Sequence, residues 1–136
     1  MTIDSKLAGK IALVTGGSRG IGRAIVETLA ADGADVTFVY RGAAEAANEV
    51  VAQATGRGLR VAAERADVRD APQCEALVEK IISRHGTIDI LVNNAGVVRD
   101  GLLAMLSADD VREVIETNLI GTMTMSRAVV PTMISQ

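Results

Sequence analysis

The sequence predicts an α/β fold, a doubly wound parallel sheet with helices on both faces. Three observations support this prediction. Short apolar runs alternate with longer helical patterns along the chain, as in consecutive strand–helix–strand units. The runs are short and mostly apolar, which is typical of strands buried on both faces. A glycine-rich turn, residues 15–22, stands between the first run and the first helix.

Four strands are expected, each a short run rich in apolar or β-branched residues. They are residues 11–15, 35–40, 59–64 and 88–92. The first and the last are almost wholly apolar, and the second is rich in β-branched and aromatic residues. The third follows this pattern more weakly, so we expect it at an edge of the sheet.

Helical patterns follow each of these strands. They span about residues 20–31, 43–55 and 70–85, and a long final helix begins at Ser107. Gly33 suits the position just after the first helix, and Pro72 suits the first turn of the third. Ser107 is a good N-cap, and acidic residues stand in the turn that follows it. Pro131 lies late in the final helix and is expected to kink or end it.

Right-handed crossovers between these strands predict the order 3-2-1-4. Ligands of such sheets bind beyond the carboxyl ends of the strands, where the strand order reverses. The first and fourth strands flank this point. We therefore expect the glycine-rich turn and residues 93–96, which follow the fourth strand, to face one crevice.

The composition predicts one globular domain over residues 1–136, of which 49% are hydrophobic. The net charge of −3, with no basic stripe, argues against a nucleic-acid partner. Apolar runs are too short to span a membrane, and residues 1–6 read as a polar lead-in rather than a signal peptide. The single cysteine, Cys74, fits a reducing compartment, so a cytoplasmic protein is expected. Neither Cys74 nor the single histidine, His85, suggests a metal site.

The glycine-rich turn has the composition of an anion site. Its residues after Thr15 are Gly16, Gly17, Ser18, Arg19, Gly20, Ile21 and Gly22. Backbone N–H groups at a helix start lack intrahelical partners, and the helix dipole favours negative charge there. Glycines let the chain turn tightly and let a pyrophosphate approach. With a strand before it and a helix after it, the turn predicts dinucleotide binding rather than a structural loop.

Two motifs together resemble the short-chain dehydrogenase/reductase family over residues 7–136. They are Thr15-Gly-x-x-x-Gly20-x-Gly22 and Asn93-Asn94-Ala95-Gly96. Within the family, residues 94–103 and 115–119 are similar to the 3-oxoacyl-[acyl-carrier-protein] reductases. The resemblance implies a Rossmann domain and hydride transfer from NADPH to a 3-oxoacyl thioester ketone, as in fatty acid synthesis.

The family's catalytic set is Asn, Ser, Tyr and Lys, and only Asn118 has a match here. The one tyrosine, Tyr40, has Ala44 at the Tyr-x-x-x-Lys spacing. By this resemblance the chain is the cofactor-binding half, ending before the fifth strand and the Ser/Tyr/Lys segment. General acid–base assistance is worth about 10²–10⁴ in rate, so the chain alone is expected to be inactive. The alternative is that Asn118 marks a helix kink, with its side chain bonding nearby backbone.

The end of the second strand indicates which nicotinamide cofactor is preferred. NAD-binding proteins usually place Asp or Glu there, for the ribose 2′-hydroxyl. This chain has Tyr40 and Arg41 instead, and Arg19 is expected to reach the same spot. Arginine suits a 2′-phosphate, so NADP(H) is the expected cofactor. The alternative is that both arginines are solvated surface residues.

The resemblance assigns further contacts to the cofactor. Asp67 would accept from the adenine amino group, and Val68 would offer a backbone contact. Asn94, Ala95 and Gly96 would shape the end of the sheet and touch a ribose, and Tyr40 lies where the family reads the adenosine ribose. The alternatives are an ordinary turn at Asp67 and a strand-end turn at 94–96.

Three functions remain open from the sequence. The chain is half of an enzyme, a fragment that binds a nucleotide but catalyses no reaction, or an assembly module. The third interpretation rests on the free edge of the fourth strand, which is apolar. A homo-oligomer, or pairing with a complementary C-terminal half, is expected, since the long helix packs against another subunit in the family.

Overall fold

Four parallel strands form the sheet of this protein, which a computed structural model describes over residues 5–136. They are β1 (Ile11–Thr15), β2 (Asp35–Tyr40), β3 (Val61–Arg65) and β4 (Ile90–Val92). Their order is β3-β2-β1-β4, so the predicted order is confirmed and the third strand does lie at an edge. Residues 1–4 of the predicted polar lead-in lie outside the described residues.

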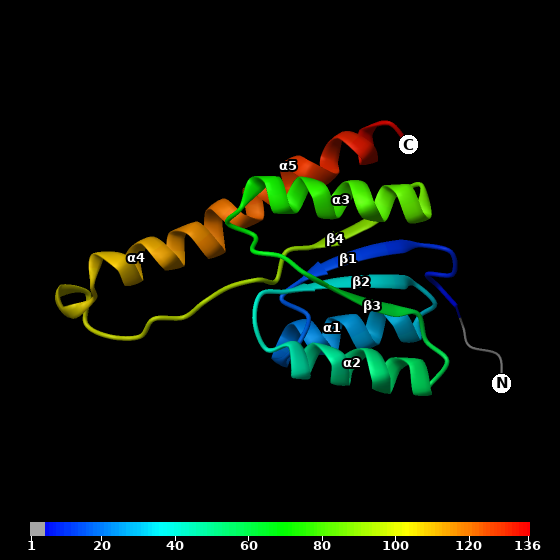
Figure 1. The fold of residues 1–136 in the computed structure, drawn as a ribbon, viewed down its shortest axis with the longest axis horizontal. Helices are drawn as coiled ribbons and strands as arrows, with labels where there is room; N and C mark the ends of the chain where they lie inside the picture. Colours follow the sequence, from blue (N-terminus) through cyan, green and yellow to red (C-terminus); the bar gives the residue numbers. More distant parts are fainter. Residues whose placement is uncertain (1–4) are drawn as a thin grey trace.

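Helices cover both faces of the sheet (Figure 1). One layer consists of α1 (Gly20–Ala31) and α2 (Ala44–Gly56), and the other of α3 (Ala71–His85) and α5 (Gly121–Ile134). A short 3₁₀ turn, η1 (Leu103–Met105), precedes α4 (Ala108–Ile115), and the π-helical segment η2 (Glu116–Ile120) joins α4 to α5. Figure 1 shows α4 and the chain before it extending beyond the carboxyl ends of the strands.

Strand β1 separates two hydrophobic cores. Successive side chains of a strand point to opposite faces. Ala12 and Val14 accordingly pack with residues of α1 and α2, whereas Ile11 and Leu13 pack with residues of α3 and α5. All four side chains are buried, which explains why the sequence of β1 is apolar without alternation. The burial on both faces fixes the end of β1, and with it the start of the glycine-rich turn.

Two strands begin later than the sequence suggests. Leu59 lies between α2 and β3, and its N–H donates to the Ala54 carbonyl in the last turn of α2 at 2.9 Å. Gly58, with a φ of 72°, allows this reversal, and β3 starts at Val61. Before β4, the Ile11 N–H donates to the Asp89 carboxylate at 2.8 Å. A side chain thus takes the place of a ladder partner, and β4 starts at Ile90.

The long final helix is present but interrupted. Ser107 is its N-cap, and the Ser107 hydroxyl accepts from the Asp110 N–H at 3.0 Å, as predicted. At Asn118, where the sequence predicts a kink, the chain forms the π-helical segment η2. Of the two predicted effects of Pro131, an end to the helix is wrong, because α5 continues to Ile134, and a kink stays a prediction. Proline this near the C-terminus removes one N–H donor from the helix, and the remaining turn still forms.

Candidate functional site

The glycine-rich turn leaves β1 and leads directly into α1. The N–H groups of Gly16 and Gly17 donate to the Val39 carbonyl at 2.9 and 3.3 Å, which ties the turn to β2. Gly16 has a φ of 68°, and a Cβ there would lie 3.0 Å from the Ala95 Cα. A Cβ on Gly22 would collide with the Gly16 carbonyl oxygen. Only glycine therefore allows this close approach of the turn to its own helix.

The start of α1 is open to an anion. Arg19 occupies the N-cap position, and within the described part of the chain it makes no side-chain cap hydrogen bond. The first turn of α1 also contains no acidic side chain. Amide groups at a helix start attract anions when no side chain caps them. This arrangement provides a binding position for a phosphate group.

Thr15 joins the ends of β1 and β4. Its hydroxyl oxygen accepts from the N–H groups of Asn94 and Ala95 at 3.0 and 2.9 Å. The Asn94 side chain in turn donates to the Gly16 carbonyl at 3.0 Å. These bonds hold the two sequence motifs together at the strand-order reversal, as the topology predicts. The Asn94 side chain therefore links the two motifs by a hydrogen bond.

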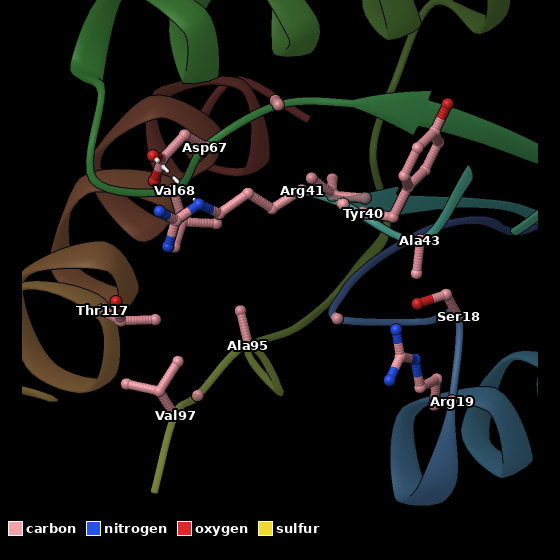
Figure 2. Close-up of a pocket in the computed structure, with 15 residues that line it drawn as sticks. Ser18, Arg19, Tyr40, Arg41, Ala43, Asp67, Val68, Ala95, Val97 and Thr117 are labelled. Carbon is pink, nitrogen blue, oxygen red and sulfur yellow. Dashed lines mark ion pairs between the residues drawn. The ribbon is translucent and has the colours of Figure 1, made fainter. Parts of the chain in front are cut away.

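A cleft of about 230 Å³ opens at the carboxyl ends of the strands (Figure 2). Nine of the residues predicted to contact a cofactor line it: Gly16, Ser18, Arg19, Tyr40, Arg41, Asp67, Val68, Ala95 and Gly96. These residues come from the ends of three strands and from the glycine-rich turn. The structure thus brings together residues that lie far apart in the sequence.

The other predicted site residues do not line this cleft. They are Gly17, Gly20, Ile21, Gly22, Asn94 and Asn118. Among them, Gly22 and Asn94 shape the turn from behind, and the Ile21 side chain is 74% exposed.

Arg41 extends along the cleft toward Asp67 and Val68, away from Arg19 (Figure 2). Its Nε lies 3.6 Å from Asp67 Oδ2, and its Nη1 lies 3.8 Å from Glu113 Oε1. The two arginine side chains thus lie in different parts of the cleft, and their shared binding of one 2′-phosphate stays a prediction. Two carboxylates attract the Arg41 guanidinium, and Arg19 has no such neighbours among the ion pairs of the described residues.

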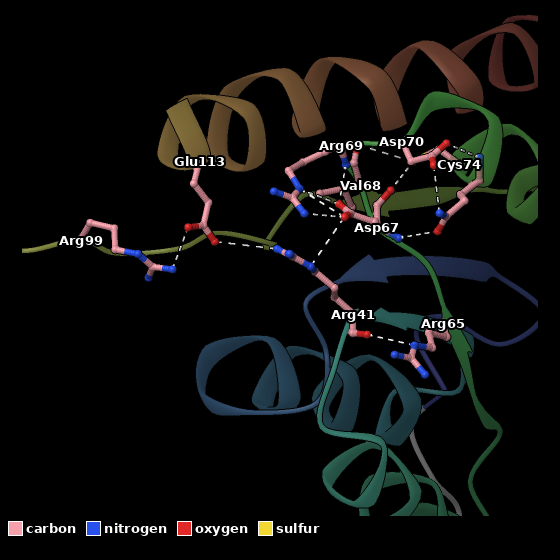
Figure 3. A network of polar contacts seen from close by, with 10 residues as sticks. Arg41, Arg65, Asp67, Val68, Arg69, Asp70, Cys74, Arg99 and Glu113 are labelled. Atoms are coloured by element: carbon pink, nitrogen blue, oxygen red, sulfur yellow. Dashed lines mark hydrogen bonds and ion pairs between the residues drawn. The ribbon is translucent and has the colours of Figure 1, made fainter. Parts of the chain in front are cut away.

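Asp67 is engaged by Arg69 more closely than by Arg41 (Figure 3). Arg69 Nη2 donates to Asp67 Oδ2 at 2.7 Å, and Arg69 Nε donates to Oδ1 at 3.0 Å. The Arg69 backbone N–H donates to the same Oδ1 at 3.0 Å. The hydrogen bonds from the Arg69 side chain are the main reason that the pKa of the Asp67 carboxyl lies below its usual value. Asp67 therefore carries a negative charge at neutral pH.

Asn118 lies in η2 and forms hydrogen bonds with the chain that follows β4. Its Oδ1 accepts from the Val97 N–H at 2.8 Å, and its Nδ2 donates to the Val97 carbonyl at 3.0 Å. The Asn118 carbonyl accepts from the Thr122 hydroxyl at 3.1 Å. The side chain thus bonds the backbone of the segment after β4, 21 positions away in the sequence.

Sequence reasoning missed six residues that line the cleft: Val39, Gly42, Ala43, Ala66, Val97 and Thr117. Most are small or apolar and give no chemical signal in the sequence. Ala43 has a φ of 54°, a left-handed conformation that costs a non-glycine residue about 1–2 kcal/mol. Thr117 has a buried hydroxyl without a hydrogen-bond partner among residues 5–136. Its position beside Asn118 was the one signal that could have found it.

Within residues 5–136, no group of three or more His, Cys, Asp or Glu side chains is placed to hold a metal ion. The same residues contain no helix of the length and apolar character needed to cross a bilayer.

Comparisons with known proteins place this arrangement in a family. The family model for short chain dehydrogenases matches residues 10–136. The 3-oxoacyl-[acyl-carrier-protein] reductase FabG of Escherichia coli K12 is 45% identical over 130 residues, which are 94% of this chain and 51% of that protein. The chain spans about half the length of the curated relatives it matches.

Solved structures show the same architecture. A short chain dehydrogenase from Burkholderia cenocepacia J2315, in complex with NADP, is 44% identical with a TM-score of 0.88. The match covers 93% of this chain and 52% of that one. A blue fluorescent protein from a metagenomic library, in complex with NADPH, is 41% identical with a TM-score of 0.85, over 93% of this chain and 52% of that one. By sequence and by fold, this chain belongs to the short chain dehydrogenase family.

Proposed function

We propose that this chain is the NADPH-binding half of a reductase that transfers hydride to the ketone of a 3-oxoacyl thioester. The observation that carries the proposal is the uncapped, glycine-cradled start of α1, which opens into the cleft lined by Arg19 and Arg41. The relatives named FabG support the substrate class, and the solved structures that contain NADP or NADPH support the cofactor.

The residues of the cleft fit such a cofactor. Gly16 and Gly22 let the turn lie close to its neighbouring backbone, since a Cβ on either would meet protein atoms, and the amides at the start of α1 suit a diphosphate. Arg19 and Arg41 supply guanidinium groups for a 2′-phosphate, with Tyr40 beside them. Asp67, Val68, Ala95 and Gly96 line the rest of the cleft and would hold the adenosine and ribose groups. When bound, NADPH supplies the hydride.

Asn118 has a positioning role in this proposal. Because both polar atoms of its side chain bond Val97, it fixes the chain that enters the cleft from β4. A proton relay through Asn118 would need the lysine that the family resemblance calls for. No Tyr-x-x-x-Lys stands in the 136 residues, so we expect cofactor binding without turnover.

The proposal also covers the substrate carrier, the location and the assembly of the enzyme. The substrate would be linked to an acyl carrier, and the enzyme would be cytoplasmic and would self-associate. The alternative is a nucleotide-binding or assembly fragment that serves no reductase.

Titration with NADPH and NADH, followed by cofactor fluorescence, tests the proposal. We expect NADPH to bind at least about tenfold more tightly, since charge-assisted bonds to a phosphate are worth about 1.5–3 kcal/mol each. Addition of an acetoacetyl thioester should then cause no NADPH oxidation. Failure to bind NADPH would overturn the proposed function, and steady oxidation would show that catalysis does not need the tyrosine and lysine. The intact mass of the native protein shows whether residues follow Gln136 and separates half-enzyme from fragment.

A further inference from the structure

Arg41 connects the end of the sheet to α4. It follows β2, and its guanidinium has acidic neighbours from two other elements, Asp67 after β3 and Glu113 on α4. Glu113 stands between Arg41 and Arg99, which belongs to the chain after β4 (Figure 3). One arginine that lines the cleft is thus bound to a helix outside the sheet.

Arg41 is the more weakly held partner of both carboxylates. Asp67 pairs with Arg69 at 2.7 Å and with Arg41 at 3.6 Å. Glu113 pairs with Arg99 at 2.9 Å and with Arg41 at 3.8 Å. The Arg41 side chain is also 53% exposed, so water screens these pairs. A stronger anion could therefore take Arg41 from both partners without disturbing the two closer pairs.

A phosphate group is such an anion, because it accepts short, bidentate hydrogen bonds from a guanidinium. In the structure Arg41 points along the cleft toward Val68, away from Arg19 and the start of α1 (Figure 2). We propose that Glu113 is a latch that holds Arg41 along the cleft toward Val68, and that a 2′-phosphate must draw Arg41 from this latch to bind it. The inference rests on the proposed function, since it concerns the NADPH of the same cleft.

The latch predicts that NADPH affinity rises when one of its ion pairs is removed. Removal of the Glu113 charge should strengthen NADPH binding, because Arg41 then leaves its resting position more easily. From the range known for exposed ion pairs, we expect Kd to fall by about 1.5- to fivefold. Removal of Arg99 should have the opposite effect, because Glu113 would lose the arginine with which it pairs most closely and would hold Arg41 more firmly.

The experiment compares Glu113→Gln with Asp110→Asn by NADPH titration of the full chain. Asp110 is a matched control, because it lies on the same helix and pairs with Arg99 at 3.7 Å rather than with Arg41. Both variants lose one negative charge near an anionic ligand. We expect tighter binding with Glu113→Gln only, and no gain when the same change is made in an Arg41→Ala background.

Three outcomes would overturn the latch. They are equal effects of Glu113→Gln and Asp110→Asn, a gain that persists without Arg41, and unchanged or tighter binding with Arg99→Gln. The last variant keeps the test decisive if Glu113→Gln fails to fold. A wild-type chain that does not bind NADPH refutes the proposed function, and the latch falls with it. A wild-type chain that binds NADPH while the variants behave alike refutes the latch alone.

Discussion

The side chain of Asn118 bonds both backbone polar groups of Val97, accepting from the N–H at 2.8 Å and donating to the carbonyl at 3.0 Å. This pair joins the π-helical segment η2 to the chain after β4, across 21 positions of sequence. An amide is the one side-chain group that offers a donor and an acceptor in this way. Asparagine at position 118 is therefore explained by structure before any role in catalysis is considered.

Asn118→Ala should loosen the chain around Val97. Two hydrogen bonds are lost at an exposed position, so we expect the free energy of unfolding to fall by about 1 kcal/mol. Asn118→Asp should also destabilise, because a carboxylate accepts from the Val97 N–H but repels its carbonyl oxygen. Hydrogen exchange of the Val97 amide checks both variants. Unchanged protection in Asn118→Ala would show that the pair does not order this segment.

Gly22→Ala should disrupt the glycine-rich turn. Its Cβ would meet the Gly16 carbonyl and the Asn94 amide, and backbone cannot move aside cheaply. We expect a loss of about 1–3 kcal/mol in the free energy of unfolding. Gly56→Ala is the matched control, since position 56 is the last residue of α2 and its Cβ would meet nothing within 4 Å. Chemical denaturation of both variants should separate them, and equal effects would contradict the close approach.

Arg41→Asp should reverse the cofactor preference. The change removes a cation suited to a 2′-phosphate and places a carboxylate where NAD-binding proteins have one. We expect NADPH binding to weaken by at least about tenfold, the loss of one charge-assisted bond. NADH binding should not weaken, since its ribose carries no 2′-phosphate. Titration with both cofactors gives the ratio, and an unchanged ratio would refute a phosphate role for Arg41.

The Asp67–Arg69 pair should make stability depend on pH. Hydrogen bonds from Arg69 lower the pKa of Asp67 in the folded protein, so the pair stabilises the fold above the unfolded pKa of about 4. This contribution is lost as the pH falls through the lower, folded pKa. Asp67→Asn should therefore destabilise at pH 7 by about 1–2 kcal/mol, and the difference from wild type should shrink in acid.

Asp109→Asn serves as the control for that measurement. Its side chain is 96% exposed and lies 3.7 Å from Arg112, so little change is expected at any pH. Thermal unfolding of both variants across the acidic range provides the comparison. A difference for Asp67→Asn that stays constant with pH would contradict the charged pair.

Local sequence patterns determined the elements of this fold. The apolar run of β1, the glycines of the turn and the Ser107 cap each act within a few residues, so their signals can be read directly. The handedness of strand crossovers then fixed the order β3-β2-β1-β4. From these two steps the cleft could be placed at the ends of β1 and β4.

The tertiary structure alone decided how the polar side chains pair. The Thr15 hydroxyl bonds backbone 79 positions away, and Asn118 bonds Val97 rather than its own helix. Arg41 turns toward Asp67 and Glu113, whereas its sequence position suggested a phosphate or solvent as its partner. Periodicity and caps report on neighbours within a turn or two, whereas these contacts depend on which segments the sheet brings together. The partners of Thr15, Asn118 and Arg41 therefore follow from the tertiary structure and not from local sequence.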